Sequence, residues 1–305
     1  MRMKDMVYFL CSGSEQQPDI RIEGDHYMAN MIMRFPGGRP KALTLSYDDG
    51  VEQDEKLIEI TEKYGLKGTF NINSGCFPPE DVTYTPGTIH RRMPLNRLKE
   101  AYSKSSWEIA AHAYTHASLV GLPANIATEE VLRDRKELEE IFGTVIRGFA
   151  YPYGAYDDQS VAILKSCGFC YARTVNSTHD FHLPQDWLRL AATCHHNDPE
   201  LMNLANRFVG IKAWWDPMLF YLWGHSYEFE ACGNWEVIEE FARTVSGKDD
   251  IWYATNIEIV DYMDAASRIQ VSVNGDFAFN PSAISVWVEV DQKHVELKPG
   301  VVTEL

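Results

Sequence analysis

The sequence predicts an α/β fold close to a (β/α) barrel, followed by a small β appendage. Between residues 43 and 267, short β-prone runs alternate with amphipathic helical stretches in about seven units, which is typical of parallel barrels. From Ile269 the hydrophobic period changes to two. We therefore expect an N-terminal extension at residues 1–38, a barrel at residues 39–267 and an appendage at residues 268–305.

The predicted strands are short runs bounded by turn residues, and each is followed by a helix with recognisable end signals. The strands lie at residues 43–47, 68–73, 107–111, 145–150, 169–174, 218–223 and 251–254. The helices lie at residues 54–64, 95–104, 128–142, 157–167, 198–212 and 256–267, with a further helix that begins at Asn234. We expect Thr128, Asn234 and Asn256 to cap their helices, because their side chains accept hydrogen bonds from free N–H groups. Asn274-Gly275 predicts a hairpin in the appendage.

Composition restricts the class of partner. The chain has 305 residues and a formal net charge of -16, which leaves little basic surface for nucleic acid or an anionic membrane. It contains no apolar run of about eighteen residues and no recognisable export signal, so we expect a cytoplasmic protein with a neutral or cationic substrate. The six scattered cysteines fit reduced thiols in that compartment. A homo-oligomer remains compatible with the sequence.

Polar clusters follow four of the predicted strands. Asp48-Asp49 follows the first strand, a His-Ala-Tyr-Thr-His run follows residues 107–111, Tyr151 to Gly154 follow residues 145–150, and His225 follows residues 218–223. The carboxyl ends of parallel barrel strands meet at one mouth. We therefore expect these side chains to form one site.

The histidines of the second cluster, His112 and His116, are spaced i, i+4. On a helical turn both imidazoles would face the same side and could share a cation with a carboxylate from another strand. Two histidines and one carboxylate leave open positions for water and substrate, and they suit either zinc hydrolysis or a non-haem iron oxygenase. The second adjacent carboxylate favours hydrolysis, which needs a base for the metal-bound water. His225 could then protonate a leaving amine.

These motifs resemble those of the polysaccharide deacetylase family, carbohydrate esterase family 4. The resemblance covers roughly residues 41–265 and is carried by Ser-Tyr-Asp-Asp-Gly at residues 46–50, the His112 and His116 pair, Tyr-Pro-Tyr-Gly at residues 151–154, Asp186-Trp187 and Leu-Trp-Gly-His at residues 222–225. It implies a distorted (β/α)7 barrel and the metal-dependent removal of acetyl groups from N-acetylated sugars.

The resemblance also implies residue roles. Asp48 would be the general base, and Asp49, His112 and His116 would hold a divalent metal, with Zn²⁺ expected first and Co²⁺ or Ni²⁺ as alternatives. His225 would be the general acid, tuned by Asp186. The backbone N–H of Tyr153 would help to stabilise the oxyanion, and Trp187 would line the acetyl pocket.

One departure from the family pattern concerns Asp48. The family's third motif usually begins with an arginine that holds the base, but this chain has Ala150. Arg173 or Arg189 could supply that contact. We also expect Tyr151, Tyr153, Arg173 and His196 to lie at the substrate site.

Three functions remain open from the sequence. The first is a metal-dependent deacetylase of N-acetylated amino sugars or their oligomers. The second is a hydrolase of another small amide, cyclic or N-formyl, that uses the same site. The third is an inactive carbohydrate-binding protein on the same scaffold, which the alanine at position 150 suggests.

Overall fold

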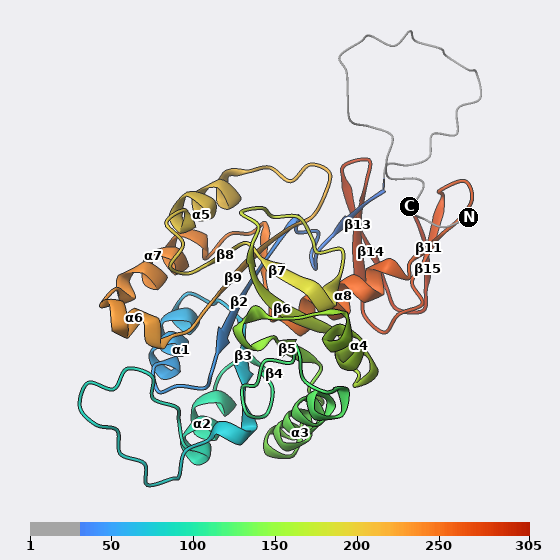
Figure 1. Cartoon of the computed structure of the whole chain (residues 1–305). Coiled ribbons are helices and arrows are strands. Elements are labelled where there is room, and N and C mark those ends of the chain that lie inside the picture. The colour runs from blue at the N-terminus through green and yellow to red at the C-terminus, as the bar shows by residue number, and fades with distance from the viewer. Residues whose placement is uncertain (1–30) are drawn as a thin grey trace, which may run out of the picture.

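The computed structural model describes residues 31–305, so most of the predicted extension at residues 1–38 lies outside the described residues. Figure 1 shows strands surrounded by helices, with the β appendage at one side. The largest sheet is entirely parallel, as the predicted α/β barrel requires, and the strands after α8 are antiparallel. The predicted fold class is therefore confirmed.

Six of the predicted strand regions form most of the barrel wall. In spatial order they are β6 (Tyr171–Ser177), β5 (Gly148–Ala150), β4 (Glu108–Ala111), β3 (Gly68–Ile72), β2 (Lys41–Asp48) and β9 (Met218–Gly224). All eight residues of β2 are buried, because neighbouring strands cover its edges and the core covers both faces.

A segment that the sequence pattern did not reveal closes the wall. β7 (Leu190–Ala192) pairs with β6, and β8 (Cys194–His195) pairs with β9. Only Thr193 separates them, and its N–H donates to the Tyr221 carbonyl at 2.8 Å. Residues 190–195 therefore form one strand that joins β6 to β9, which gives seven positions around the barrel.

The predicted strand at residues 251–254 has a different place. β10 (Ile251–Tyr253) pairs with residues 41–43 of β2, while β3 pairs with residues 45–48 along the rest of that strand. β10 therefore extends the sheet beside the first half of β2, and residues 190–195 supply the seventh wall strand in its stead.

Seven of the eight helices between residues 31 and 305 lie close to their predicted positions, with different capping in three of them, and α6 was not predicted. They are α1 (Asp54–Lys63), α2 (Leu95–Ser103), α3 (Ala124–Phe142), α4 (Asp158–Ser166), α5 (Leu201–Gly210), α6 (Tyr227–Cys232), α7 (Trp235–Val245) and α8 (Asn256–Ser267). Thr128 was predicted to cap α3 but lies inside it, where its hydroxyl donates to the Ala124 carbonyl at 2.7 Å. Thr255, rather than Asn256, caps α8 through a capping box with Glu258. Asn234 precedes α7 without a side-chain capping bond.

The N-terminus of α8 packs under the amino end of the barrel through Glu108. The half-buried Glu108 carboxylate accepts hydrogen bonds from Thr69 Oγ1 at 2.9 Å, Tyr171 Oη at 2.8 Å and the Ile257 N–H at 2.8 Å. Burial nevertheless raises the pKa of Glu108 to about 7. This carboxyl joins β3, β4, β6 and α8 at the end opposite the predicted mouth.

The appendage consists of two small antiparallel sheets. One contains β1 (Met31–Arg34), β13 (Val286–Val290) and β14 (Lys293–Leu297), and the other contains β11 (Gln270–Val271), β12 (Phe277–Phe279) and β15 (Val302–Glu304). β11 and β12 form the predicted hairpin around Gly275, whose φ is +80°. The pairing of β1 with β13 brings part of the predicted extension into the appendage. The three-part division itself stays a prediction.

Within residues 31–305 no helix has the length and hydrophobicity needed to cross a membrane.

Candidate active site

Asp48 and Asp49 end β2 with their carboxylates in different surroundings. Asp48 is 2% exposed and Asp49 is 7% exposed. Asp49 has a φ of +84°, which L-residues rarely adopt, and the chain turns sharply there. Asp48 Oδ1 and Oδ2 contact Asn71 and Arg173, whereas Asp49 Oδ1 and Oδ2 contact Arg92 and His90. The two acids therefore have separate partners, as a division of roles requires.

Asp48 is held by a neighbouring strand on each side. Asn71, its register partner on β3, donates from Nδ2 to Oδ1 at 2.8 Å, and the Arg173 guanidinium forms an ion pair with Oδ2. Burial alone would raise the pKa of this carboxyl, but Arg173, with help from His112 and His225, outweighs burial and lowers it. Asp48 is therefore ionised and fixed.

Arg173 supplies the cation that is missing at position 150. It lies on β6 directly opposite Ala150 on β5, so its guanidinium reaches Asp48 from the adjacent strand. Its side chain is fully buried and stacks on the Trp223 ring, with 4.5 Å between the guanidinium carbon and the ring centroid. Arg189, the other candidate, pairs with Asp158 and Asp186. Because Arg173 is fully buried, it lies behind Asp48 and not on the exposed substrate side where we expected it.

Asp49 is held by two residues of the loop before α2. Arg92 donates to the Asp49 main-chain carbonyl and to Oδ1, both at 2.8 Å, and His90 Nε2 lies 3.1 Å from Oδ2. Burial opposes ionisation of Asp49, but His90, Arg92 and His112 together hold its pKa well below the usual range. Arg92 also fixes the unusual backbone of Asp49, since it binds main chain and side chain together.

His112 and His116 meet on a loop and not on the helical turn that their spacing suggested. Ala113 and His116 have φ values of +62° and +61°. The imidazole rings of His112 and His116 meet edge to face, with their centroids 4.8 Å apart. α3 supports the loop from behind: Asp134 accepts from the His112 N–H at 2.9 Å, and Glu130 accepts from the Thr115 N–H at 2.8 Å. The i, i+4 spacing thus brings the imidazoles together by a different backbone path.

The residues present fit a divalent metal. One ligand atom from each of Asp49, His112 and His116 lies within 4.8 Å of the others. His112 Nδ1 donates to the Ala150 carbonyl at 2.7 Å, which leaves Nε2 with a free lone pair, and burial lowers the pKa of His112 to about 4. The pKa of His116 is lowered by its burial as well. Two neutral imidazoles and one carboxylate are a donor set that zinc accepts in open sites.

His225 follows β9 and faces Asp48 across the mouth. His225 Nε2 lies 3.8 Å from Asp48 Oδ2, and Nδ1 lies 3.2 Å from Glu228 Oε1. Burial lowers the pKa of His225, but the Glu228 hydrogen bond and the Asp48 charge outweigh it, so the net shift is upward. Glu228 also lies 3.1 Å from His195 Nε2 and 2.9 Å from His196 Nε2. The Glu228 carboxylate therefore contacts three histidines beside the mouth.

The other predicted site residues lie in different places. Tyr153 is 70% exposed and meets His116 edge to face, at 4.7 Å between ring centroids, so it lies at the mouth. Tyr151 is buried, and its hydroxyl donates to the Leu188 carbonyl at 2.9 Å. His196 is buried between Tyr47 and Phe229, without a well-aligned hydrogen bond.

Asp186 and Trp187 lie away from the mouth. They precede β7, so they belong to the amino end of that strand. Trp187 shares a surface pocket with Arg147 and Cys170, which precede β5 and β6. Asp186 caps the short turn Trp187–Arg189 and pairs with Arg189. Glu228 occupies the position beside His225 that was expected for Asp186.

Sequence reasoning did not assign His90, Arg92 or Glu228 to the site. His90 and Arg92 lie in a loop without periodicity, and contacts such as the bridge between Val51 and Arg92 bring that loop to Asp49. Glu228 carried a usable signal, because it lies at i+3 from His225 at the start of a helix.

Comparisons with known proteins agree with this geometry. Residues 36–172 match the profile of the polysaccharide deacetylase family. The uncharacterized protein YlxY of Bacillus subtilis (strain 168) is 24% identical over 156 residues, which cover 51% of this chain and 42% of that protein. The chain thus spans less than half of the length of this relative.

The chain is also similar to solved structures. A Mycobacterium smegmatis protein provisionally described as a polysaccharide deacetylase is 18% identical, with a TM-score of 0.56 over 77% of this chain and 94% of that one. A family 4 carbohydrate esterase from Streptomyces lividans, solved with acetate, is 14% identical, with a TM-score of 0.46 over 70% of this chain and 91% of that one. The match at residues 36–172 confirms the resemblance predicted from the sequence. Residues 36–172, slightly less than half of the chain, thus match the polysaccharide deacetylase family, and the chain has a (β/α)7 barrel fold.

Proposed function

We propose that the protein is a metal-dependent hydrolase that removes N-acetyl groups from amino sugars or their oligomers. One observation carries the proposal: Asp48 Oδ2 lies 3.7 Å from His112 Nε2 and 3.8 Å from His225 Nε2. A buried carboxylate is thus flanked on one side by a neutral imidazole of the candidate metal set and on the other by an imidazole with a raised pKa. Base, metal ligand and acid are arranged side by side.

Asp49, His112 and His116 would hold the metal, most simply Zn²⁺. When bound, such a cation lowers the pKa of a coordinated water and polarises an acetyl carbonyl. Asp48, ionised and fixed by Arg173 and Asn71, takes a proton from the attacking water. The backbone N–H of Tyr153, at the mouth, would donate a hydrogen bond to the acetyl carbonyl oxygen as that oxygen becomes negatively charged.

His225 completes the reaction as the general acid. Its raised pKa keeps a proton on the imidazole, which Nε2 donates to the leaving amine. Glu228 orients the ring through Nδ1 and stabilises the protonated form. Protonation of the nitrogen turns a poor leaving group into a neutral amine, so this step suits an amide substrate.

The same groups would serve another small amide, so the substrate needs a direct test. We expect acetate release from N-acetylglucosamine or its oligomers by protein loaded with zinc, and little turnover of N-formyl or cyclic amides. Turnover of only those amides would replace the proposed substrate. A protein that binds zinc but releases no acetate from any N-acetyl sugar would contradict the proposal. The intact set of Asp48, Asp49, His112, His116 and His225 argues against an inactive scaffold.

A further inference from the structure

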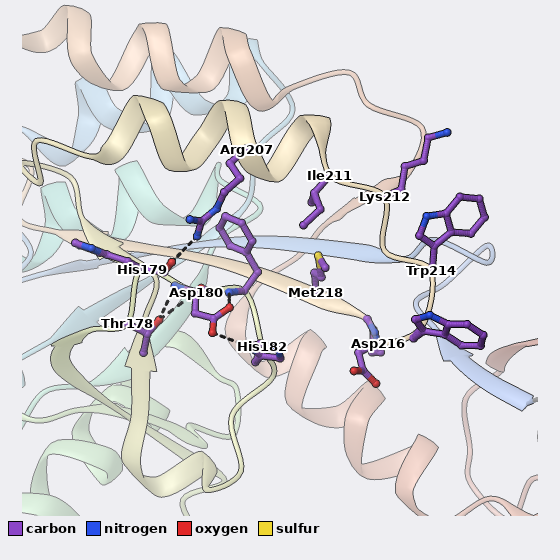
Figure 2. Close-up of a pocket in the computed structure, with 13 residues that line it drawn as sticks. Thr178, His179, Asp180, His182, Arg207, Ile211, Lys212, Trp214, Asp216 and Met218 are labelled. Carbon is purple, nitrogen blue, oxygen red and sulfur yellow. Dashed lines mark hydrogen bonds and ion pairs between the residues drawn. The ribbon is translucent and has the colours of Figure 1, made fainter. Parts of the chain in front are cut away.

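A pocket of about 530 Å³ lies on the barrel wall, outside the candidate active site. It is bounded by α5, the loop after β6 and the loop before β9 (Figure 2). His179, Asp180 and Arg207 lie at one end of it, and Trp214 and Asp216 lie at the other. No proposed catalytic or metal-binding residue lines it. The pocket is therefore separate from the acetyl-removing chemistry.

Two adjacent tryptophans are exposed at this pocket. Trp214 is 67% exposed and Trp215 is 69% exposed, whereas no other tryptophan of residues 31–305 is exposed. Their backbone is held from behind by Arg34, which is 3% exposed and donates to the Trp214 carbonyl at 2.8 Å and the Trp215 carbonyl at 3.4 Å. Arg34 is in turn paired with Glu289 of the appendage at 2.9 Å. The indoles are thus presented to solvent on an anchored loop.

The pocket continues on both sides. A pocket of about 330 Å³ shares Thr178, Asp180 and His182 with it and extends to Arg189. Another, of about 530 Å³, shares Lys212 and Trp214 with it and extends to the appendage. Shared lining residues join the three pockets into one groove from the barrel wall to the appendage. An extended chain fits such a groove better than a single small molecule does.

Several charged groups along this groove are paired with one another, whereas Arg207, Lys212 and Asp216 form no ion pair among the described residues. Arg189 pairs with Asp186, His182 Nδ1 lies 2.7 Å from Asp180 Oδ2, and Arg34 pairs with Glu289. A polyanion would require a row of uncompensated cations, but this lining offers only Arg207 and Lys212 outside ion pairs, together with the acid Asp216. Paired charges can still exchange hydrogen bonds with hydroxyl groups, and exposed indoles offer flat apolar faces. This chemistry suits an uncharged, hydroxyl-rich ring.

We propose that the groove binds a neutral oligosaccharide chain away from the active site, with Trp214 and Trp215 stacking on its sugar rings. The choice of an N-acetylated sugar as ligand rests on the proposed function. His179, at one end of the pocket, contacts Asp198 at 2.6 Å, three residues beyond His195 of the cluster around Glu228. A chain in the groove is therefore held near the mouth, which raises the local concentration of its acetylated units.

The test uses the full chain with the Asp48→Asn substitution, so that binding is measured without turnover. The probe is the hexamer of β-1,4-linked N-acetylglucosamine, and isothermal titration calorimetry gives its Kd. We expect Trp214→Ala with Trp215→Ala to raise the Kd for the hexamer about tenfold or more, because two stacking contacts are lost. Phenylalanine at both positions should restore part of the affinity. Phe277→Ala, which removes an exposed aromatic ring from the appendage, is the matched control and should leave the Kd unchanged.

Steady-state kinetics of variants that keep Asp48 provide a second test of the groove. The double alanine variant should raise KM for the hexamer and leave kcat/KM for the monosaccharide unchanged. Unchanged hexamer binding and KM in this variant would overturn the groove proposal. So would a change of oligomeric state in sedimentation with unchanged sugar binding, since the tryptophans would then form an interface between copies. Tryptophan-dependent binding without any acetate release would contradict the proposed function alone.

Discussion

Arg173 and Ala150 lie directly opposite each other on β6 and β5, and the Arg173 guanidinium forms a buried ion pair with Asp48. The main chain of Ala150 has a separate role, because its carbonyl fixes the tautomer of His112. The arginine that the family resemblance leads one to expect at position 150 thus lies at the facing position of the next strand. Asp48 and His112, the proposed base and a proposed metal ligand, are both oriented from this pair of strands.

Arg173→Met should lower kcat/KM by on the order of 10²-fold and lower the thermal stability, because it leaves a buried carboxylate without its cation. The pKa of Asp48 would rise under burial alone, so less of the base would be ionised at neutral pH. Arg189→Met is the matched control, since Arg189 is partly exposed and should change the free energy of unfolding by less than about 1 kcal/mol. Steady-state kinetics and thermal unfolding check both. Wild-type kcat/KM in Arg173→Met would show that another group holds Asp48.

The fold and the main site residues could be predicted because their signals are local. Alternating apolar runs and capping residues mark strands and helices, and the carboxyl ends of parallel strands meet at one mouth, which places Asp48, Asp49, His112 and His225 together. Residues 190–195 gave no such signal, because Ala191, Ala192 and Thr193 are small and the histidines that follow look like a polar loop.

The remaining site contacts depend on register and chain direction, which no local pattern fixes. Arg173 reaches Asp48 only because β6 aligns it with Ala150. Asp186 precedes its strand, so its side chain lies at the wrong end for a contact with His225. Arg92 reaches Asp49 from a loop about forty residues away, through a single bridge at Val51.

Glu228→Gln should move the basic limb of the kcat/KM profile to lower pH. The raised pKa of His225 means that the protonated acid persists to higher pH, and Glu228 gives the largest upward contribution. Without that charge the pKa of His225 falls, and the acid is lost at lower pH. Glu230→Gln, on the same helix but paired with Arg91, is the control and should leave the limb in place. An unmoved limb in Glu228→Gln would mean that Glu228 does not tune His225.

Glu108→Gln should change how stability depends on pH. Burial raises the pKa of Glu108 in the folded protein to about 7, above its ordinary value of 4.5. Its neutral form therefore contributes stability that is fully present below pH 4.5 and is lost as the pH rises through about 7. The difference in free energy of unfolding between wild type and Glu108→Gln should fall across that window, as measured by urea unfolding at several pH values. Glu100→Gln, at an exposed site, should show a constant difference, and a constant difference for Glu108→Gln would contradict the prediction.

The division of roles between Asp48 and Asp49 is the central claim, and a paired measurement of bound zinc and acetate release tests it most directly. Asp48→Asn should keep one bound zinc and lose most acetate release, by at least about 10²-fold, because only the base is removed. Asp49→Asn should lose zinc and activity together, because it removes the only carboxylate of the candidate metal set. Loss of zinc from Asp48→Asn, or full zinc binding by Asp49→Asn, would contradict the account.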